Sequence, residues 1–216
     1  MIAGLLLAAG KSSRFGSNKL CAKIGGKAVI RQSIGVLSPL DAIYVVIPPG
    51  ADAVIQALSR LDVSFVVNLG RDEGMASSIR AGIAALPADC DAVVIALADQ
   101  PLADPNVTRA LCERWRAGDP PAVVPTYTDG RGHPVLFARQ CFPALMELRG
   151  DVGARAILEE LGTRVATITI GTTMPVDVDT PDALAQLDVI PSEVEGSAPA
   201  ACVRGADPST RCARSG

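Results

Sequence analysis

The sequence predicts an α/β fold in which a mostly parallel sheet is covered by helices on both faces. Short apolar runs alternate with longer helix-like stretches along nearly the whole chain, as strands and crossover helices do in such folds. Several runs are continuously apolar, which is typical of parallel strands buried on both faces. Hydrophobic residues make up 49% of the chain and aromatic residues only 3%, so we expect a core of Val, Leu, Ile and Ala.

The elements are separated by residues that stop or start regular structure. The first apolar run gives way to small residues at Ala8, the third element stops at Pro48 and Pro49, and Asp52 can cap the helix that follows. In chain order we expect strand 2–7, helix 28–37, strand 42–47, helix 52–60, strand 63–67, helix 75–86, strand 91–97, helix 105–116, strands 122–125 and 134–137, helices 142–148 and 153–161, strand 165–170 and a final helix from residue 181.

Two further expectations concern the later part of the chain. The strands on either side of Gly130 are separated by a short glycine-containing turn, so we expect a local antiparallel excursion there. Residues 1–190 are expected to form one domain. Residues 191–216 are rich in Ser, Pro, Ala and Gly and have no apolar periodicity, so we expect a disordered tail without chemistry of its own.

Charge and composition argue against several classes of protein. A net charge of −3 and a pI near 5.2 do not fit a surface that coats nucleic acid. No apolar run is long enough to cross a bilayer, and the N-terminus does not read as a signal peptide, so we expect a cytoplasmic protein without membrane contact. The six cysteines are scattered and the chain has one histidine, so we expect reduced thiols and no zinc site.

The loop after the first strand, residues 8–19, has the composition of an anion-binding loop. Gly10 and Gly16 can adopt positive φ, and successive backbone N–H groups in such a loop form a concavity for anions. Arg14 and Lys19 add two cations. A solvated surface turn is the alternative, but the position directly after a buried strand favours phosphate binding.

Carboxylates follow two other expected strand ends. Asp99 ends the strand 91–97 region, where it could either cap the next helix or bind Mg²⁺ that bridges nucleotide phosphates. Asp177 and Asp179 are two residues apart in an extended segment, so we expect them to point to opposite faces. Only one of the two is then expected to reach the site that Asp99 lines, while the other faces solvent or caps the final helix.

The first loop resembles a specific family signature. It has neither the Walker spacing nor GxGxxG, but it matches L-A-A-G-x-S-x-R-[FM]-G-x-x-K, the signature of nucleotidyltransferases that act on sugar and pterin phosphates. The resemblance, to the MobA-like nucleotidyltransferase family, covers about residues 2–187. It implies a Rossmann-like three-layer sandwich of the nucleotide-diphospho-sugar transferase type for domain 1–190. The matching residues are Leu7, Ala8, Ala9, Gly10, Ser12, Arg14, Phe15, Gly16 and Lys19.

The resemblance also implies roles for individual residues. The second Asp of D-[IV]-D-T-P takes the metal role in the family, which selects Asp179 as the partner of Asp99 in a Mg²⁺ site. The G-x-x-S-S run places Gly74, Ser77 and Ser78 near the base of the nucleotide, although helix capping is an alternative for the serines. Nucleotide contacts are implied for Leu7, Ala8, Ala9, Gly10, Ser12, Arg14 and Lys19, and catalytic roles for Arg14, Lys19 and Asp99.

Two later motifs resemble the branch of the family that modifies the molybdenum cofactor. The segment GRGHPVLF, which resembles the branch's pattern GRxGHPVLF, contains Gly132 and His133, and the segment that matches GDxGAR contains Asp151 and Arg155. Both are expected near the acceptor substrate, whereas a glycine turn, a structural histidine and a helix start are the alternatives. Ala9 stands where guanylyltransferases of the family have the first Gly of L-A-G-G, which favours cytosine over guanine.

The implied function is Mg²⁺-dependent transfer of CMP from CTP to the terminal phosphate of molybdopterin, with release of pyrophosphate. Two alternatives remain: a related transferase that uses GTP or a sugar or alditol phosphate, and a non-catalytic carrier of the molybdenum cofactor. A carrier need not keep Arg14, Lys19, Asp99 and Asp179 together, so their joint presence favours the enzyme. A transient contact with a molybdenum hydroxylase or its maturation factor is compatible with this function.

Overall fold

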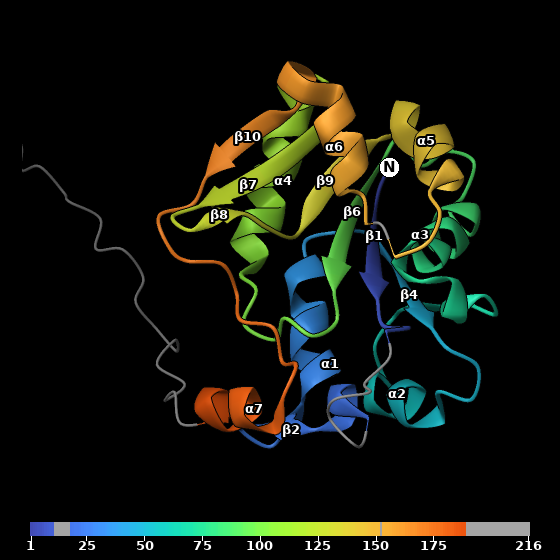
Figure 1. The fold of residues 1–216 in the computed structure, drawn as a ribbon, viewed down its shortest axis with the longest axis vertical. Coiled ribbons are helices and arrows are strands. Elements are labelled where there is room, and N and C mark those ends of the chain that lie inside the picture. Colours follow the sequence, from blue (N-terminus) through green and yellow to red (C-terminus); the bar gives the residue numbers. More distant parts are fainter. Residues whose placement is uncertain (11–17, 152, 189–216) are drawn as a thin grey trace, which may run out of the picture.

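The computed structural model describes residues 1–10, 18–151 and 153–188, and its frame is one sheet (Figure 1). The strand order is β10-β7-β9-β6-β1-β4-β5, with β8 paired to β7 beside this path. The strands are β1 (Ile2–Leu7), β4 (Ala42–Ile47), β5 (Ser64–Val67), β6 (Ala92–Leu97), β7 (Ala122–Tyr127), β8 (Gly130–Arg131), β9 (Val135–Ala138) and β10 (Ala166–Thr169).

The sheet is mostly parallel, as predicted. β1 pairs in parallel with both β4 and β6, and the pairs β4–β5 and β7–β10 are also parallel. The antiparallel segment is larger than the predicted local excursion, because β9 is inserted between β6 and β7 and pairs antiparallel with both. All four residues of β9 are buried, which explains why this short strand lies inside the sheet and not at an edge.

Helices cover both faces of the sheet and complete three layers (Figure 1). Side chains of β1 alternate between them: Ile2 and Leu6 pack on one side and Leu5 on the other. Leu5 and Leu6 are fully buried, and burial of each contributes about 1.5–3 kcal/mol. One layer contains α1 (Val29–Ser33), α2 (Asp52–Ala57), α4 (Pro105–Arg116) and α7 (Pro181–Asp188), and the other contains α3 (Met75–Ala84), α5 (Phe142–Glu147) and α6 (Arg155–Leu161).

Local details differ from the sequence-based expectations. Asp52 is the first residue of α2 and not its cap, because the N-cap position is taken by Ala51. A small hairpin, β2 (Lys23–Ile24) with β3 (Lys27–Ala28), was not expected, since two-residue strands carry no readable periodicity. Short 3₁₀ helices are also present: η1 (Lys19–Cys21), η2 (Ile34–Leu37), η3 (Arg71–Glu73), η4 (Arg139–Cys141) and η5 (Gly162–Arg164).

The fold brings three loops to one edge of the sheet. β1, β5 and β6 run in the same direction, so the segments that follow their carboxyl ends lie at the same edge of the sheet. Ligands of open α/β sheets bind at this edge. The expected tail, 191–216, lies outside the described residues. Among the helices that the structure describes, none combines the length and apolar character that a membrane span requires.

Candidate active site

One lysine joins the two carboxylates that the sequence singles out. The Nζ atom of Lys19 lies 2.7 Å from Oδ2 of Asp99 and 2.8 Å from Oδ1 of Asp179. Lys19 begins η1, Asp99 follows β6, and Asp179 precedes α7, so residues up to 160 positions apart meet here. Only 9% of Lys19 is exposed. The structure therefore places these three predicted residues in one charged cluster.

Backbone contacts hold the cluster in place. The N–H of Val178 donates to the carbonyl of Asp99 at 2.8 Å, and the fully buried Val178 side chain packs into the core. Asp99 does not serve as the cap of the next helix, because Asp104 takes the N-cap position of α4 and accepts from Asn106 N at 2.8 Å. Of the two readings of Asp99, capping is thus excluded.

The charge state of Lys19 follows from two opposing effects. Burial lowers its pKa, but the hydrogen bonds to Asp179 and Asp99 and their negative charges together outweigh burial, so the pKa lies above the ordinary value of 10.5. Lys19 is therefore protonated at neutral pH. Because the pKa of Lys19 is raised in the folded state, protonated Lys19 stabilises the fold fully below the ordinary lysine pKa. This stabilisation is lost as the pH rises through the raised pKa.

Asp177 is exposed, as expected for the carboxylate that does not bond to Lys19. Its Oδ1 accepts a hydrogen bond from Nε2 of Gln100 at 2.9 Å. Partial burial of the carboxyl raises its pKa, against the hydrogen bond from Gln100, and Asp99 and Asp179 add to the rise. The separation of the two carboxylates does not come from strand alternation, because this segment is not a strand and Asp179 N donates to the carbonyl of Asp177 at 3.1 Å. Thr180 contacts the first turn of α7 instead, accepting from Ala183 N at 3.2 Å.

The Lys19 cluster has the donor chemistry of a Mg²⁺ or Mn²⁺ site. A cation already lies between the two carboxylates, in the form of the Lys19 ammonium group. Hard divalent cations prefer carboxylate oxygens, and Mg²⁺ in nucleotide sites uses one or two carboxylates plus substrate phosphates. Within the described residues no group of three or more His, Cys, Asp or Glu side chains gathers as a metal site. Asp99 and Asp179 therefore fit a metal that is completed by a phosphate substrate.

A cavity of about 630 Å³ opens beside this cluster at the carboxyl ends of β1, β5 and β6; we call it the strand-end cavity. Seven residues to which the sequence assigns a role line it: Leu7, Ala9, Gly10, Gly74, Ser78, Asp99 and Asp151. Ala8 and Ser77 are buried and do not line it. Two further predicted nucleotide contacts, Ser12 and Arg14, lie outside the described residues.

Asn68 joins the loop after β5 to α3 beside the strand-end cavity, and no role was predicted for its side chain. Its Nδ2 donates to Oγ of Ser77 at 2.8 Å and to Oγ of Ser78 at 3.0 Å, and its Oδ1 accepts from Gly70 N at 2.9 Å. Ser77 Oγ in turn donates to the carbonyl of Gly74 at 2.8 Å. The hydroxyl of Ser77 therefore bonds the loop to the start of α3, which supports a structural role for this residue over a contact with the nucleotide. Ser78 lines the cavity.

Gly74 lets two distant segments approach each other. Its φ of +91° favours glycine, and a Cβ built there would lie 2.6 Å from the carbonyl carbon and oxygen of Gly150. The same approach lets the start of α3 bond to this segment: Ala76 N donates to the carbonyl of Gly150 at 3.2 Å, and Met75 N donates to Oδ1 of Asp151 at 3.2 Å. Asp151, predicted near the acceptor, thus lies at the wall of the strand-end cavity.

Replacing Gly74 by Ala is expected to lower the free energy of unfolding by about 2–4 kcal/mol, because a strained φ is combined with a backbone clash. Gly162→Ala is the matched control: its φ is also positive, +55°, but an added Cβ meets nothing within 4 Å. The control should lose only about 1 kcal/mol. Urea unfolding of both variants measures the difference, and equal losses would show that the contact with Gly150 carries no weight.

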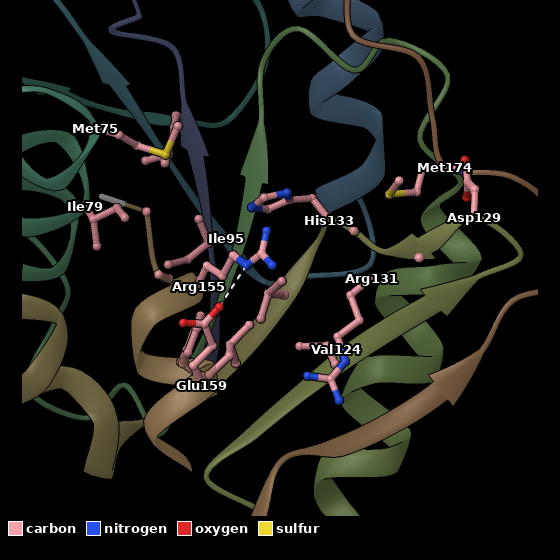
Figure 2. Close-up of a pocket in the computed structure, with 18 residues that line it drawn as sticks. Met75, Ile79, Ile95, Val124, Asp129, Arg131, His133, Arg155, Glu159 and Met174 are labelled. Atoms are coloured by element: carbon pink, nitrogen blue, oxygen red, sulfur yellow. Dashed lines mark hydrogen bonds and ion pairs between the residues drawn. The ribbon is translucent and has the colours of Figure 1, made fainter. Parts of the chain in front are cut away.

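A second cavity, of about 590 Å³, lies beside the β7–β8–β9 hairpin; we call it the hairpin cavity (Figure 2). Three residues predicted near the acceptor line it: Gly132, His133 and Arg155. Arg155 comes from the start of α6, where Nε donates to Glu159 Oε1 at 3.0 Å, and Figure 2 shows its guanidinium and the His133 imidazole directed toward the same space. The two cavities share Leu7 and Met75, so they meet there.

His133 is held by the hairpin rather than by the cluster. Burial lowers its pKa below the ordinary value of 6.5, and the negative charge of Asp99 opposes this only in part, so the imidazole is neutral at pH 7. Its backbone carbonyl accepts from the hydroxyl of Tyr127 at 2.8 Å. Burial, with the charges of Asp104 and Asp129, raises the pKa of Tyr127 to about 12, so this donor stays protonated.

Sequence reasoning missed several lining residues. Met174 in the hairpin cavity packs so closely on Gly132 that a Cβ there would lie 2.9 Å from its Sδ. Arg71 lines the strand-end cavity and Gln100 holds Asp177. The position of Arg71 and Gln100, just after strand ends, could have identified them, whereas nothing in the sequence around Met174 marks it.

Comparison with known proteins agrees with this geometry. A family model described as the MobA-like NTP transferase domain matches residues 4–165. The chain belongs to this family. As a MobA-like domain it is a nucleotidyltransferase with the predicted nucleotide-diphospho-sugar transferase fold. The match ends before Asp177, so only the structure joins Asp179 to the rest of the site.

Individual relatives cover most of the MobA-like chain. The purine catabolism protein PucB of Bacillus subtilis (strain 168) is 29% identical over 199 residues, which is 83% of this chain and 92% of PucB. The crystal structure of Rv0371c from Mycobacterium tuberculosis H37Rv is 29% identical, with a TM-score of 0.77 over 87% of this chain and 97% of that one. Its manganese complex is 27% identical, with a TM-score of 0.73 over 86% and 97% of the two chains.

Proposed function

We propose that this MobA-like domain transfers CMP from CTP to the terminal phosphate of molybdopterin in the molybdenum cofactor, with release of pyrophosphate and dependence on Mg²⁺. The observation that carries the proposal is the Lys19–Asp99–Asp179 cluster, whose Asp99 lines the strand-end cavity, together with the hairpin cavity that adjoins it. One cavity per substrate is what a transfer between two bound molecules needs, and the shared residues Leu7 and Met75 mark where they would meet.

The reaction requires alignment and charge neutralisation. An oxygen of the acceptor phosphate forms a bond to the α-phosphorus of CTP while the bond from that phosphorus to the bridging oxygen breaks, and pyrophosphate leaves. The acceptor phosphate is already ionised at neutral pH, so no general base is needed. Positioning of this kind is worth several orders of magnitude in rate.

Individual residues take distinct roles in this proposal. Lys19 neutralises phosphate charge, and Arg14 with the N–H groups of the first loop stabilises the leaving pyrophosphate. Asp99 and Asp179 would hold Mg²⁺, which when bound withdraws charge from the α-phosphate. The manganese complex of Rv0371c, a relative at 27% identity, supports a divalent cation in this family.

The hairpin cavity suits the acceptor. Arg131, His133 and Arg155 lie at its polar side and can contact anionic groups, while Val135 and Phe137 give it an apolar wall for a ring system. The segments that resemble the motifs GRxGHPVLF and GDxGAR of the molybdenum-cofactor branch supply these residues. The product would pass to a molybdenum hydroxylase or its maturation factor through a transient contact.

Pyrophosphate release with Mg²⁺ and molybdenum cofactor tests the proposal when CTP, GTP, ATP and UTP are compared. We expect turnover with CTP in large excess over the other three. Preference for GTP would assign the chain to guanylyl transfer with the same mechanism, and turnover only with sugar or alditol phosphates would replace the acceptor. Tight cofactor binding without turnover of any nucleotide would identify a carrier instead of an enzyme.

A further inference from the structure

Arg71 has hydrogen-bonding capacity that the described chain does not use. It begins η3, the short helix after β5, and lines the strand-end cavity together with Gly10 and Asp99. Its Nε–H is shielded from solvent and has no hydrogen-bond partner among the described residues. Buried donors are nearly always paired in folded proteins, so an unpaired guanidinium N–H in a side chain that lines a cavity indicates a group that a ligand completes.

Several acceptors near Arg71 are engaged with other groups. Glu73, two residues along, pairs through Oε2 with Nη2 of Arg80 at 2.5 Å. The side-chain oxygen of Asn68 accepts from Gly70 N. The start of α3 is closed as well, because Gly150 and Asp151 bond to its first N–H groups. Among the described residues that line this cavity, Arg71 is the one that carries a positive charge.

Strand order fixes which part of a nucleotide Arg71 can meet. The order β6-β1-β4-β5 separates the segment after β6, with Asp99, from the segment after β5, with Arg71, by three strand spacings. Adjacent strands are about 4.8 Å apart, so the two segments leave the sheet roughly 14 Å apart. If the phosphates bind at Asp99 and Lys19, as the proposed function on which this inference rests requires, the base extends toward Arg71.

We propose that Arg71 recognises the nucleotide base and selects cytosine over uracil. A guanidinium group carries only donors, in a planar fork that matches two neighbouring acceptors. Cytosine presents such a pair on one edge, O2 and N3. Uracil presents O2 beside an N3–H donor, which would oppose an Arg71 donor. The burial of Nε makes this mismatch costly, because water cannot supply the lost partner.

Nucleotide binding tests this proposal without an acceptor. The affinities of the wild-type chain, Arg71→Gln and Arg71→Lys for CTP and UTP are measured by titration calorimetry in Mg²⁺. The wild type should prefer CTP by roughly 10-fold to 100-fold, the range for a bidentate base contact. Gln offers one donor and one acceptor, which fit O2 and N3–H of uracil, so Arg71→Gln should abolish or reverse the preference. Arg71→Lys keeps the charge but loses the fork, so it should also lose the preference.

Controls and contrary results are equally specific. Arg109→Gln, a change of an exposed arginine on α4, should leave both affinities unchanged, and thermal melting checks that each variant is folded. If Arg71→Gln lowers the affinities for CTP and UTP equally, Arg71 contacts the phosphates, and base recognition is overturned. A wild type that does not prefer CTP, or that binds no nucleotide, would also overturn base recognition. A wild type that binds CTP selectively through Arg71 but releases no pyrophosphate would refute the proposed function and not this inference.

Discussion

Replacing Asp99 by Asn is expected to lower the rate of pyrophosphate release by at least about 10²-fold, the effect of losing one aligned electrostatic group at a reaction centre. The substitution keeps the shape of the side chain and the backbone carbonyl that accepts from Val178. It removes the negative charge that faces Lys19 at 2.7 Å and that would hold the metal. The loss should appear in kcat, because the charge acts where phosphate bonds change.

Asp104→Asn is the matched control for this prediction. It makes the same change five residues along the chain, where Asp104 caps α4, and Asn caps a helix as well as Asp does. Both variants should melt within a few degrees of the wild type, and only the Asp99 variant should be inactive. Asp99→Asn with wild-type turnover would remove the carboxylate from the mechanism and leave Lys19 as a structural residue.

The sequence predicted the bounds of the strands better than it predicted their order in the sheet. Strands such as residues 2–7 and 42–47 have the same bounds in the structure, because continuous apolar runs between turn residues have no competing interpretation. The insertion of β9 between β6 and β7 was not predictable, since an antiparallel hairpin next to a parallel strand depends on packing and not on periodicity. Helix α4 had the same bounds as predicted, whereas α2 ends at Ala57, well before residue 60.

For the site, the sequence identified which residues carry charge but not how they pair. Lys19 and Asp99 were singled out by their positions after expected strands and Asp179 by a resemblance, and their direct contact required the three-dimensional structure because up to 160 residues separate them. The exposed position of Asp177 was among the expected outcomes, but the argument from strand alternation does not hold for this irregular segment. Asn68 and Arg71 lie in a loop that follows an expected strand, but their individual roles were not predicted, because only burial and hydrogen-bond geometry show what each side chain does.

Replacing Lys19 by Met is expected to change two measurements in opposite directions. Pyrophosphate release should fall by about 10²-fold, because a cation that neutralises the phosphates is lost. Binding of Mn²⁺ in the absence of nucleotide should become tighter by about 10-fold or more, since the ammonium group no longer occupies the space between Asp99 and Asp179 and the pair of carboxylates has lost its positive partner. Titration of free Mn²⁺ followed by electron paramagnetic resonance measures the second effect.

Opposite changes in activity and in Mn²⁺ binding distinguish a lysine that occupies the metal site from one that only forms a structural ion pair. Lys23→Met, a similar change at an exposed lysine on β2, should alter neither measurement. If Lys19 only braced the two carboxylates, its loss would let them move apart, and Mn²⁺ binding would weaken along with activity. If instead activity falls while metal binding tightens, the lysine and the metal compete for the same two oxygens. Nucleotide binding, which draws Lys19 toward the phosphates, would then have to precede metal binding.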